Sequence, residues 1–225
     1  MLIDNRPITG AIFDLDGTLL DTMDMWENIG PEYLKKTGIE ARADLADILR
    51  PMGIPQAASY LQAAYNLPLT VEQILDDICV MTIDIYKYCL PKAGAAEFVN
   101  RLHARNVKLA IATATERLML LPALRRTGLL RWFDCIVTCT EEKTTKDQPA
   151  IFRCALQKLG TVKESTWVFE DAPHAAKTAK RDSFPVVGIF DRTQEKQLDQ
   201  LRSYSDLYFK SFLQGIDFLT MKEEL

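Results

Sequence analysis

The sequence Phe13-Asp14-Leu15-Asp16-Gly17-Thr18-Leu19-Leu20-Asp21 directly follows an apolar pair, so it places two carboxylates at the end of an expected buried strand. Side chains alternate along a strand, so Asp14 and Asp16 point the same way, and Gly17 allows a sharp turn just after them. Two like charges about 4 Å apart repel by roughly 4 kcal/mol at an effective dielectric of about 20. We therefore expect this pair to hold a cation, to share a proton or to take part in a reaction.

Short apolar runs of strand length alternate with amphipathic segments of helix length along most of the chain. The strand-like runs cover residues 10–15, 107–113, 133–138, 166–170 and 185–190. This alternation is typical of a parallel sheet with helices on both faces, which predicts an α/β fold. In open parallel sheets, ligands bind outside the carboxyl ends of the strands, where we expect Asp14, Thr113 and Asp171 to meet.

The interval of residues 24–88 has a different pattern, because its apolar residues recur with helical periodicity and it contains no strand-like run. Turn-forming residues flank this interval, at 17–21 and again at 90–94. We therefore predict a core domain made of residues 1–20 and 91–225, and an inserted all-helical cap domain made of residues 21–90.

Four segments, taken in chain order, resemble the four motifs of the haloacid dehalogenase superfamily of phosphohydrolases. The first family motif, Asp-x-Asp-Gly-Thr, matches residues 14–18, and the second, a Thr or Ser that ends an apolar strand, matches Thr113. The third, Lys-Pro-x-Pro-Asp-Ile-Phe, matches residues 146–152 with two identities changed, and the fourth, an acidic pair after a strand, matches Glu170 and Asp171. The resemblance spans almost the whole chain and implies a Rossmann-like core with a helical cap inserted between the first two motifs.

This resemblance also implies a catalytic role for four of the motif residues. Asp14 would attack phosphorus and form an aspartyl-phosphate, while Asp16 would protonate the leaving oxygen and later take a proton from water. Thr113 and the backbone amide of Ala114 would bind the transferred phosphoryl group, and Lys146 would bind it and neutralise its charge.

Mg²⁺ is the cofactor that these residues predict. A phosphate dianion beside several carboxylates needs more positive charge than Lys146 supplies, and carboxylate and carbonyl oxygens are the ligands that Mg²⁺ prefers. The predicted ligands are Asp14, Asp171, Glu170 and the backbone carbonyl of Asp16. Glu170 could bind the ion directly or support another ligand.

Four further residues are predicted to contact the substrate because of their positions. Trp26, Arg50 and Gln56 flank the first hinge or the expected specificity loop of the cap, and His174 follows the acidic pair of the fourth motif. The alternative for His174 is a partly exposed residue of a helix, without a functional role.

The second acid of the first motif favours phosphoryl transfer over dehalogenation, because a halide leaving group needs no proton from Asp16. We predict a phosphatase that cleaves a small phosphorylated metabolite, such as a sugar, polyol or nucleotide phosphate. A sugar phosphomutase of the β-phosphoglucomutase type is one alternative, although residues 53–56 read Gly-Ile-Pro-Gln where that branch has Gly-x-Ser-Arg to grip a second phosphate. A catalytically silent, phosphate-binding regulatory protein is the other.

Charge and hydropathy limit the expected partners. The chain has 225 residues, with 27 Lys and Arg against 31 Asp and Glu, a net charge of −4 and no basic block. This balance gives no electrostatic footprint for nucleic acid or anionic lipid. The N-terminal residues lack the apolar region of a signal peptide, and no apolar run is long enough to cross a membrane. We therefore expect a cytoplasmic enzyme with no nucleic-acid or membrane partner, which is a monomer or, alternatively, a dimer.

Overall fold

The computed structural model describes residues 2–3, 6–49 and 52–221. The chain divides into two compact units, one formed by Met1–Asp21 together with Cys89–Leu225 and the other by Thr22–Tyr88. The first is an α/β unit, and the second contains helices and no strand among its described residues.

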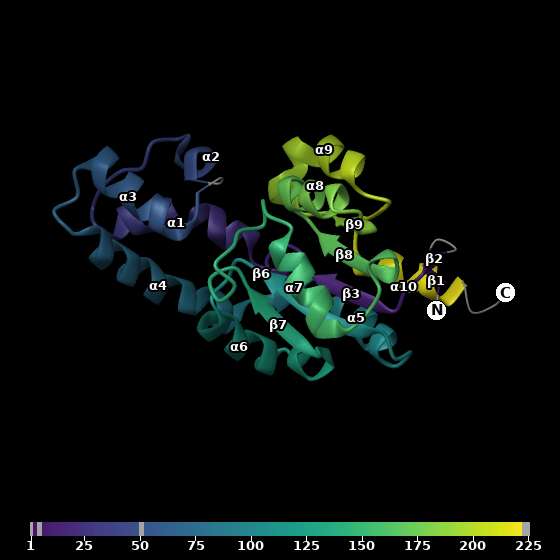
Figure 1. Ribbon diagram of the computed structural model, residues 1–225. Helices are drawn as coiled ribbons and strands as arrows, with labels where there is room; N and C mark the ends of the chain where they lie inside the picture. The colour runs from purple at the N-terminus through teal and green to yellow at the C-terminus, as the bar shows by residue number, and fades with distance from the viewer. Residues whose placement is uncertain (1, 4–5, 50–51, 222–225) are drawn as a thin grey trace. The chain divides into compact units, whose positions relative to one another are not determined.

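A six-stranded parallel sheet forms the centre of the α/β unit, in the order β10-β9-β8-β3-β6-β7 (Figure 1). The strands are β3 (Gly10–Phe13), β6 (Lys108–Thr113), β7 (Cys135–Thr138), β8 (Thr166–Glu170), β9 (Val186–Ile189) and β10 (Leu207–Phe209). The predicted α/β fold with a Rossmann-like parallel sheet is thus confirmed. The edge strand β10 lies outside the predicted runs, and β3 ends at Phe13 rather than at residue 15 because the chain turns directly after it.

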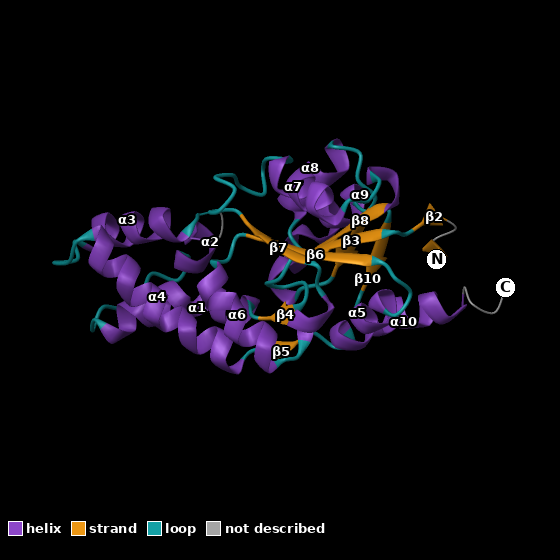
Figure 2. Ribbon diagram, turned by 60° about the horizontal axis from the view of Figure 1, so that its bottom comes forward, coloured by secondary structure: helices purple, strands orange, loops and turns teal. Residues whose placement is uncertain are grey.

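Helices cover both faces of this sheet. Figure 2 shows α7, α8 and α9 on one side of the strands, and α5 and α10 on the other. The helices of the unit are α5 (Ala95–His103), α6 (Arg117–Arg126), α7 (Ala150–Leu159), α8 (Pro173–Arg181), α9 (Leu198–Tyr204) and α10 (Phe212–Met221), with short 3-10 turns η1 (Leu129–Trp132), η2 (Lys163–Ser165) and η3 (Arg192–Gln197). In the described part of the chain, no helix combines the length and the apolar character needed to span a membrane.

The central strand β3 is buried on both faces. Ile12 belongs to an apolar cluster that includes side chains of α7 and α8. The next residue, Phe13, stacks on Phe169 of β8 with ring centroids 4.3 Å apart, and its edge meets Phe98 of α5. Burial on both faces is typical of a central strand in a parallel sheet. This packing fixes where β3 ends, and therefore where the acids of the first motif begin.

The helical unit consists of α1 (Met23–Lys36), α2 (Leu45–Leu49), α3 (Ile54–Tyr65) and α4 (Val71–Tyr88). Helix α4 packs against α3 and α1, and the helices share a small apolar core that includes Leu34, Leu61, Ile74 and Ile78. The unit therefore has a hydrophobic core of its own.

The two ends of the helical insertion are paired within the α/β unit. Strand β4 (Leu20–Asp21) pairs in antiparallel fashion with β5 (Leu90–Pro91), and the amide of Lys92 donates to the carbonyl of Leu19 at 2.9 Å. The chain therefore leaves the α/β unit and returns to it at adjacent points. A second short ribbon joins β1 (Leu2–Ile3) to β2 (Arg6–Pro7).

The ammonium group of Lys92 joins three segments of the α/β unit. Its Nζ donates to the carbonyls of Gly17 and Phe190, each at 2.9 Å, and to Oδ2 of Asp191 at 2.6 Å. Asp191 is buried and also accepts hydrogen bonds from the amide and the hydroxyl of Thr193. The turn after β3 is therefore tied both to the ribbon and to the segment after β9.

Replacing Lys92 with Met should lower the free energy of unfolding by roughly 3 kcal/mol, because Asp191 would keep a buried charge without its partner. Urea unfolding followed by circular dichroism measures this change. Lys210→Met is the matched control, since Lys210 is exposed, and it should change stability by less than about 0.5 kcal/mol. Similar losses for the two variants would contradict the structural role of Lys92.

Candidate active site

The acids of the first motif lie on the turn that follows β3. The amide of Asp14 donates to the carbonyl of Phe169 at 3.0 Å, which extends the pairing of β3 with β8 by one residue. Gly17 has a φ of 80°, in the left-handed region that glycine adopts without strain. Asp14 is buried against the sheet, whereas Asp16 is half-buried. The turn thus gives the two carboxyl groups different surroundings.

Lys146 connects the first, third and fourth motifs. Its Nζ forms an ion pair with Oδ1 of Asp14 and donates to Oε1 of Glu170 at 2.5 Å. Burial alone would lower the pKa of this lysine, but Asp14 and Glu170 together raise it above its ordinary value. Lys146 therefore remains an ammonium group that holds two carboxylates from different strand ends.

A cluster of three buried acids lies at the carboxyl ends of β3 and β8. One carboxylate oxygen from each of Asp14, Glu170 and Asp171 lies within 4.8 Å of the others. Asp171 accepts a hydrogen bond from the hydroxyl of Thr18 at 2.8 Å. Burial, and next to it the charge of Asp14, raises the pKa of Asp171 well above its usual range. Burial likewise raises the pKa of Glu170 to about 8, against the opposing effect of Lys146.

The charges of this cluster favour a bound cation. The raised pKa values of Glu170 and Asp171 show that burial disfavours the charged forms of these crowded acids. If all three acids were ionised beside Lys146, the formal charge would be −2, which a divalent ion would balance. The donor atoms are oxygens, the ligands that Mg²⁺ prefers, so the residues present fit the predicted cofactor. The cluster could therefore hold a metal ion through Asp14, Glu170 and Asp171, three of the four residues predicted as ligands.

A second set of contacts lies at the end of β6. Thr113 is buried, and its Oγ1 accepts a hydrogen bond from the amide of Thr115 at 3.0 Å. The hydroxyl of Thr115 donates in turn to Oδ2 of Asp16 at 2.5 Å. The exposed residue Ala114 lies between the two threonines. The loop after β6 is therefore joined to the turn after β3 through the second acid of the first motif.

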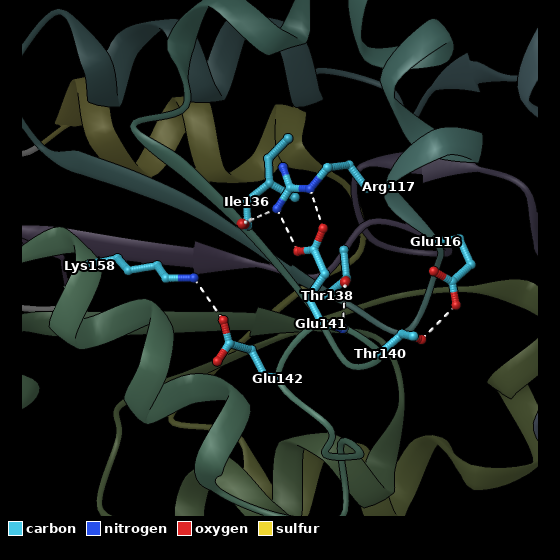
Figure 3. Close-up of polar contacts among 8 residues, drawn as sticks. All are labelled: Glu116, Arg117, Ile136, Thr138, Thr140, Glu141, Glu142 and Lys158. Atoms are coloured by element: carbon cyan, nitrogen blue, oxygen red, sulfur yellow. Dashed lines mark hydrogen bonds and ion pairs between the residues drawn. The ribbon is translucent and has the colours of Figure 1, made fainter.

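A bidentate ion pair, shown in Figure 3, joins α6 to the loop that leads from β7 to Lys146. Nε and Nη2 of Arg117 donate to the two carboxylate oxygens of Glu141 at 2.5 and 2.7 Å. Nη2 also donates to the carbonyl of Ile136 in β7, at 2.8 Å. Such paired geometry restricts orientation more than a single contact does. These contacts therefore fix the position of the loop that precedes Lys146 relative to the beginning of α6.

Two further contacts in Figure 3 join the same loop to its neighbours. The hydroxyl of Thr140 donates to Glu116 at 2.6 Å, and Lys158 of α7 donates to Glu142 at 2.8 Å. None of these residues was predicted from the sequence, because each contact joins residues at least 16 positions apart.

The structure places the other predicted substrate contacts in different surroundings. His174 is exposed at the beginning of α8, where partial desolvation lowers the pKa of its imidazole and Asp147, Lys146 and Asp14 act on it electrostatically. It therefore lies near the acid cluster, and its contact with substrate stays a prediction.

The predicted cap contacts belong to the helical segment. Trp26 lies on α1 and donates from Nε1 to the hydroxyl of Tyr86 at 3.3 Å. Gln56 is exposed in the first turn of α3, where Oε1 accepts from the amide of Gly53 at 3.3 Å and so caps the helix. Arg50 lies outside the described residues. The substrate-selecting role of these three residues and of segment 21–90 stays a prediction.

One family model matches a stretch of sequence that includes the helical insertion and most of the α/β unit. The model of the haloacid dehalogenase-like hydrolases matches residues 11–189. The chain belongs to the haloacid dehalogenase-like hydrolases. The family that the four motifs indicated is therefore confirmed.

Two relatives of this haloacid dehalogenase-like hydrolase are named for phosphatase activities. A phosphorylated carbohydrates phosphatase of Thermotoga maritima is 28% identical over 173 residues, which are 76% of this chain and 79% of that protein. Pyrophosphatase PpaX of Halalkalibacterium halodurans is 29% identical over 210 residues, which are 89% of this chain and 95% of that protein. The predicted enzyme class is thus confirmed, and this haloacid dehalogenase-like hydrolase is an enzyme of the phosphatase type.

A solved structure shares the fold of this haloacid dehalogenase-like hydrolase. The crystal structure of β-phosphoglucomutase from Clostridium difficile has a TM-score of 0.74 at 17% identity and covers 92% of each chain. At this identity the similarity shows a shared fold only. It does not distinguish a phosphatase from a mutase.

Proposed function

We propose that the protein is a Mg²⁺-dependent phosphatase that hydrolyses a small phosphorylated metabolite through an aspartyl-phosphate on Asp14. One observation carries this proposal. A buried carboxylate at the end of the central strand is held by Lys146 within a cluster of acids that can bind a divalent ion. A carboxylate with one oxygen held in place and a cation beside it is suited to attack the phosphorus of a phosphoryl group, whose negatively charged oxygens would otherwise repel it.

Lys146 has two functions in this mechanism. Its ion pair with Oδ1 of Asp14 fixes the orientation of the nucleophile before substrate binds. Its charge, which the raised pKa maintains, then offsets the negative charge on the phosphoryl oxygens during transfer.

Thr113 binds the phosphoryl group together with the amide of Ala114. Oγ1 of Thr113 already accepts a hydrogen bond from the amide of Thr115, so the orientation of the hydroxyl is restricted. The same hydroxyl keeps its own proton to donate to a phosphoryl oxygen.

Asp16 transfers the proton in both half-reactions. As the bond from phosphorus to the ester oxygen breaks, Asp16 donates a proton to that oxygen, and the alcohol leaves. Asp16 is then a carboxylate, which removes a proton from the water that attacks the aspartyl-phosphate and releases inorganic phosphate. The half-buried position of Asp16 at the turn suits this exchange with substrate and water.

The bound Mg²⁺ would polarise a phosphoryl oxygen and neutralise charge, with Asp14, Asp171 and Glu170 as the side chains that hold it. Thr18 orients Asp171 by its hydrogen bond to Oδ1, and so prepares one of these ligands.

One relative and the acid of the first motif support a proposal for the substrate class. The Thermotoga relative is named for phosphorylated carbohydrates, whose ester oxygen is a poor leaving group that needs a proton from Asp16. We therefore place sugar and polyol phosphates first among the substrates. A mutase is less well supported, because Gln56 stands where an Arg would grip a second phosphate and its side chain instead caps α3.

Asp16→Asn should lower kcat/KM for alkyl phosphates by about 100-fold or more, and should lower it much less for p-nitrophenyl phosphate, whose leaving group needs little protonation. Steady-state kinetics with a panel of sugar and polyol phosphates beside p-nitrophenyl phosphate gives both values. Equal losses for the two kinds of substrate would contradict the role of Asp16. A parent protein that turns over neither kind would indicate a phosphate-binding protein, and conversion of glucose 1-phosphate to glucose 6-phosphate would indicate a mutase.

A further inference from the structure

We propose that Thr115 is a positioning residue for proton transfer, and that its hydroxyl orients the carboxyl group of Asp16 toward the leaving oxygen. This inference rests on the proposed function, because it assigns the group that acts on the proposed general acid. Thr115 is not one of the residues that the four motifs assign.

Thr115 contacts Asp16 directly. The hydroxyl of Thr115 donates to Oδ2 of Asp16 at 2.5 Å, at the short end of the usual range for a hydroxyl and a carboxylate. Thr115 is 8% exposed, so the donor lies in a site from which most water is excluded. A short hydrogen bond to one oxygen of a half-buried carboxyl group restricts the rotation of that group.

Thr115 is itself held in place by its neighbour in the motif. Its amide donates to Oγ1 of Thr113 at 3.0 Å, so a hydrogen bond joins the two threonines within the turn after β6. Thr115 therefore connects, through two successive hydrogen bonds, the residue proposed to bind the phosphoryl group with the residue proposed to move the proton.

A helix cap is the ordinary role for a threonine before a helix, and Thr115 lies one residue before Glu116, the N-cap residue of α6. The hydroxyl of Thr115 also donates to Asp16, a residue 99 positions earlier in the chain. A local capping role does not account for this contact.

The hydrogen bond is compatible with both chemical states of Asp16. A carboxylate accepts from the hydroxyl directly, and a protonated carboxyl group retains a carbonyl-type oxygen that accepts as well. Thr115 can therefore hold Asp16 in one orientation while Asp16 gives a proton to the leaving oxygen and later takes one from water. No proton passes to or from Thr115 in this role.

The test compares Thr115→Val, which keeps the shape of the side chain and removes the hydroxyl, with Thr115→Ser, which keeps the hydroxyl. Thr115→Val should lower kcat/KM for the best sugar or polyol phosphate about 30-fold, and should lower it less than about threefold for p-nitrophenyl phosphate. Thr115→Ser should recover most of the lost activity. The ratio of the two substrates, measured on one preparation, does not depend on the fraction of folded enzyme.

The matched control is Thr127→Val, which removes a hydroxyl that donates to the carbonyl of Ala123 at the end of α6. It should leave the ratio of the two substrates unchanged. In the background of Asp16→Asn, where no acid remains to be oriented, Thr115→Val should add less than about a twofold loss.

Equal losses for the two substrates would overturn the proposal, since a residue that only binds phosphate or only stabilises the fold affects both alike. An unchanged ratio in Thr115→Val, or a large further loss in the double variant, would overturn it as well. Failure of the proposed function is recognised separately, because Asp16→Asn alone would then show no difference between the substrates, and the role of Thr115 would fall with it.

Discussion

Asp14→Asn should abolish turnover, with a loss of kcat on the order of 10⁴-fold or more, because an amide nitrogen or oxygen is a far poorer nucleophile than a carboxylate. The substitution keeps the size of the side chain, and Lys146 retains Glu170 as an ion-pair partner. The folded structure should therefore persist. Initial rates with p-nitrophenyl phosphate and with sugar phosphates measure the loss, and circular dichroism checks the fold.

Asp199→Asn is the matched control for this variant, because Asp199 is an exposed acid on α9 and should affect neither rate. Mass spectrometry after acid quenching gives a second, independent readout. A phosphoryl group should be found on the peptide that contains Asp14 in the parent enzyme, and not in the variant. Activity of Asp14→Asn within about tenfold of the parent would exclude Asp14 as the nucleophile.

Removal of divalent metal should lower activity by more than about 100-fold, and Mg²⁺ should restore it. The physical reason is the charge of the site, where three clustered carboxylates and a phosphate dianion would otherwise meet the single ammonium of Lys146. Dialysis against EDTA, followed by titration with MgCl₂ under a continuous phosphate-release assay, measures both steps.

Ca²⁺ serves as the control ion in this experiment. It has the same charge as Mg²⁺ but takes 6–8 ligands at longer and less regular distances, so it should bind without restoring the rate. Isothermal titration calorimetry should show binding of Mg²⁺ to the parent protein and weaker binding to Asp171→Asn. Full activity after exhaustive chelation would show that the reaction does not require a divalent ion bound by the acid cluster.

The sequence predicted the parts of the molecule in which local pattern and chemistry agree. Apolar runs of strand length predicted the parallel sheet, because a strand buried on both faces must be apolar along its length. Asp14, Glu170 and Asp171 were predicted because they lie at the end of such a run, and Lys146 was predicted because residues 146–152 resemble the third motif of the family. The structure brings these residues together as the carboxyl ends of neighbouring strands require.

Other features could not be predicted, because they depend on pairs of residues far apart in the chain. Lys92 and Thr115 are ordinary polar residues in the sequence, and only the folded chain shows that one holds the turn after β3 and the other contacts Asp16. The edge strand β10 has three residues, two of them half-buried, so its apolar signal is weak. The hydrogen bond that Gln56 accepts from the amide of Gly53 is local to α3, and its substrate contact stays a prediction.

The ribbon formed by β4 and β5 makes the stability of the α/β unit largely independent of the length and sequence of the segment inserted between these two strands. Once Leu20 and Asp21 are paired with Pro91 and Leu90, the ends of the inserted segment are fixed whatever lies between. The entropy of closing such a loop grows only slowly with its length, by about 0.6 kcal/mol for each doubling. Insertions of very different size or sequence are therefore compatible with one α/β unit, because exchange of a single contiguous segment leaves the acids, the lysine and the sheet unchanged.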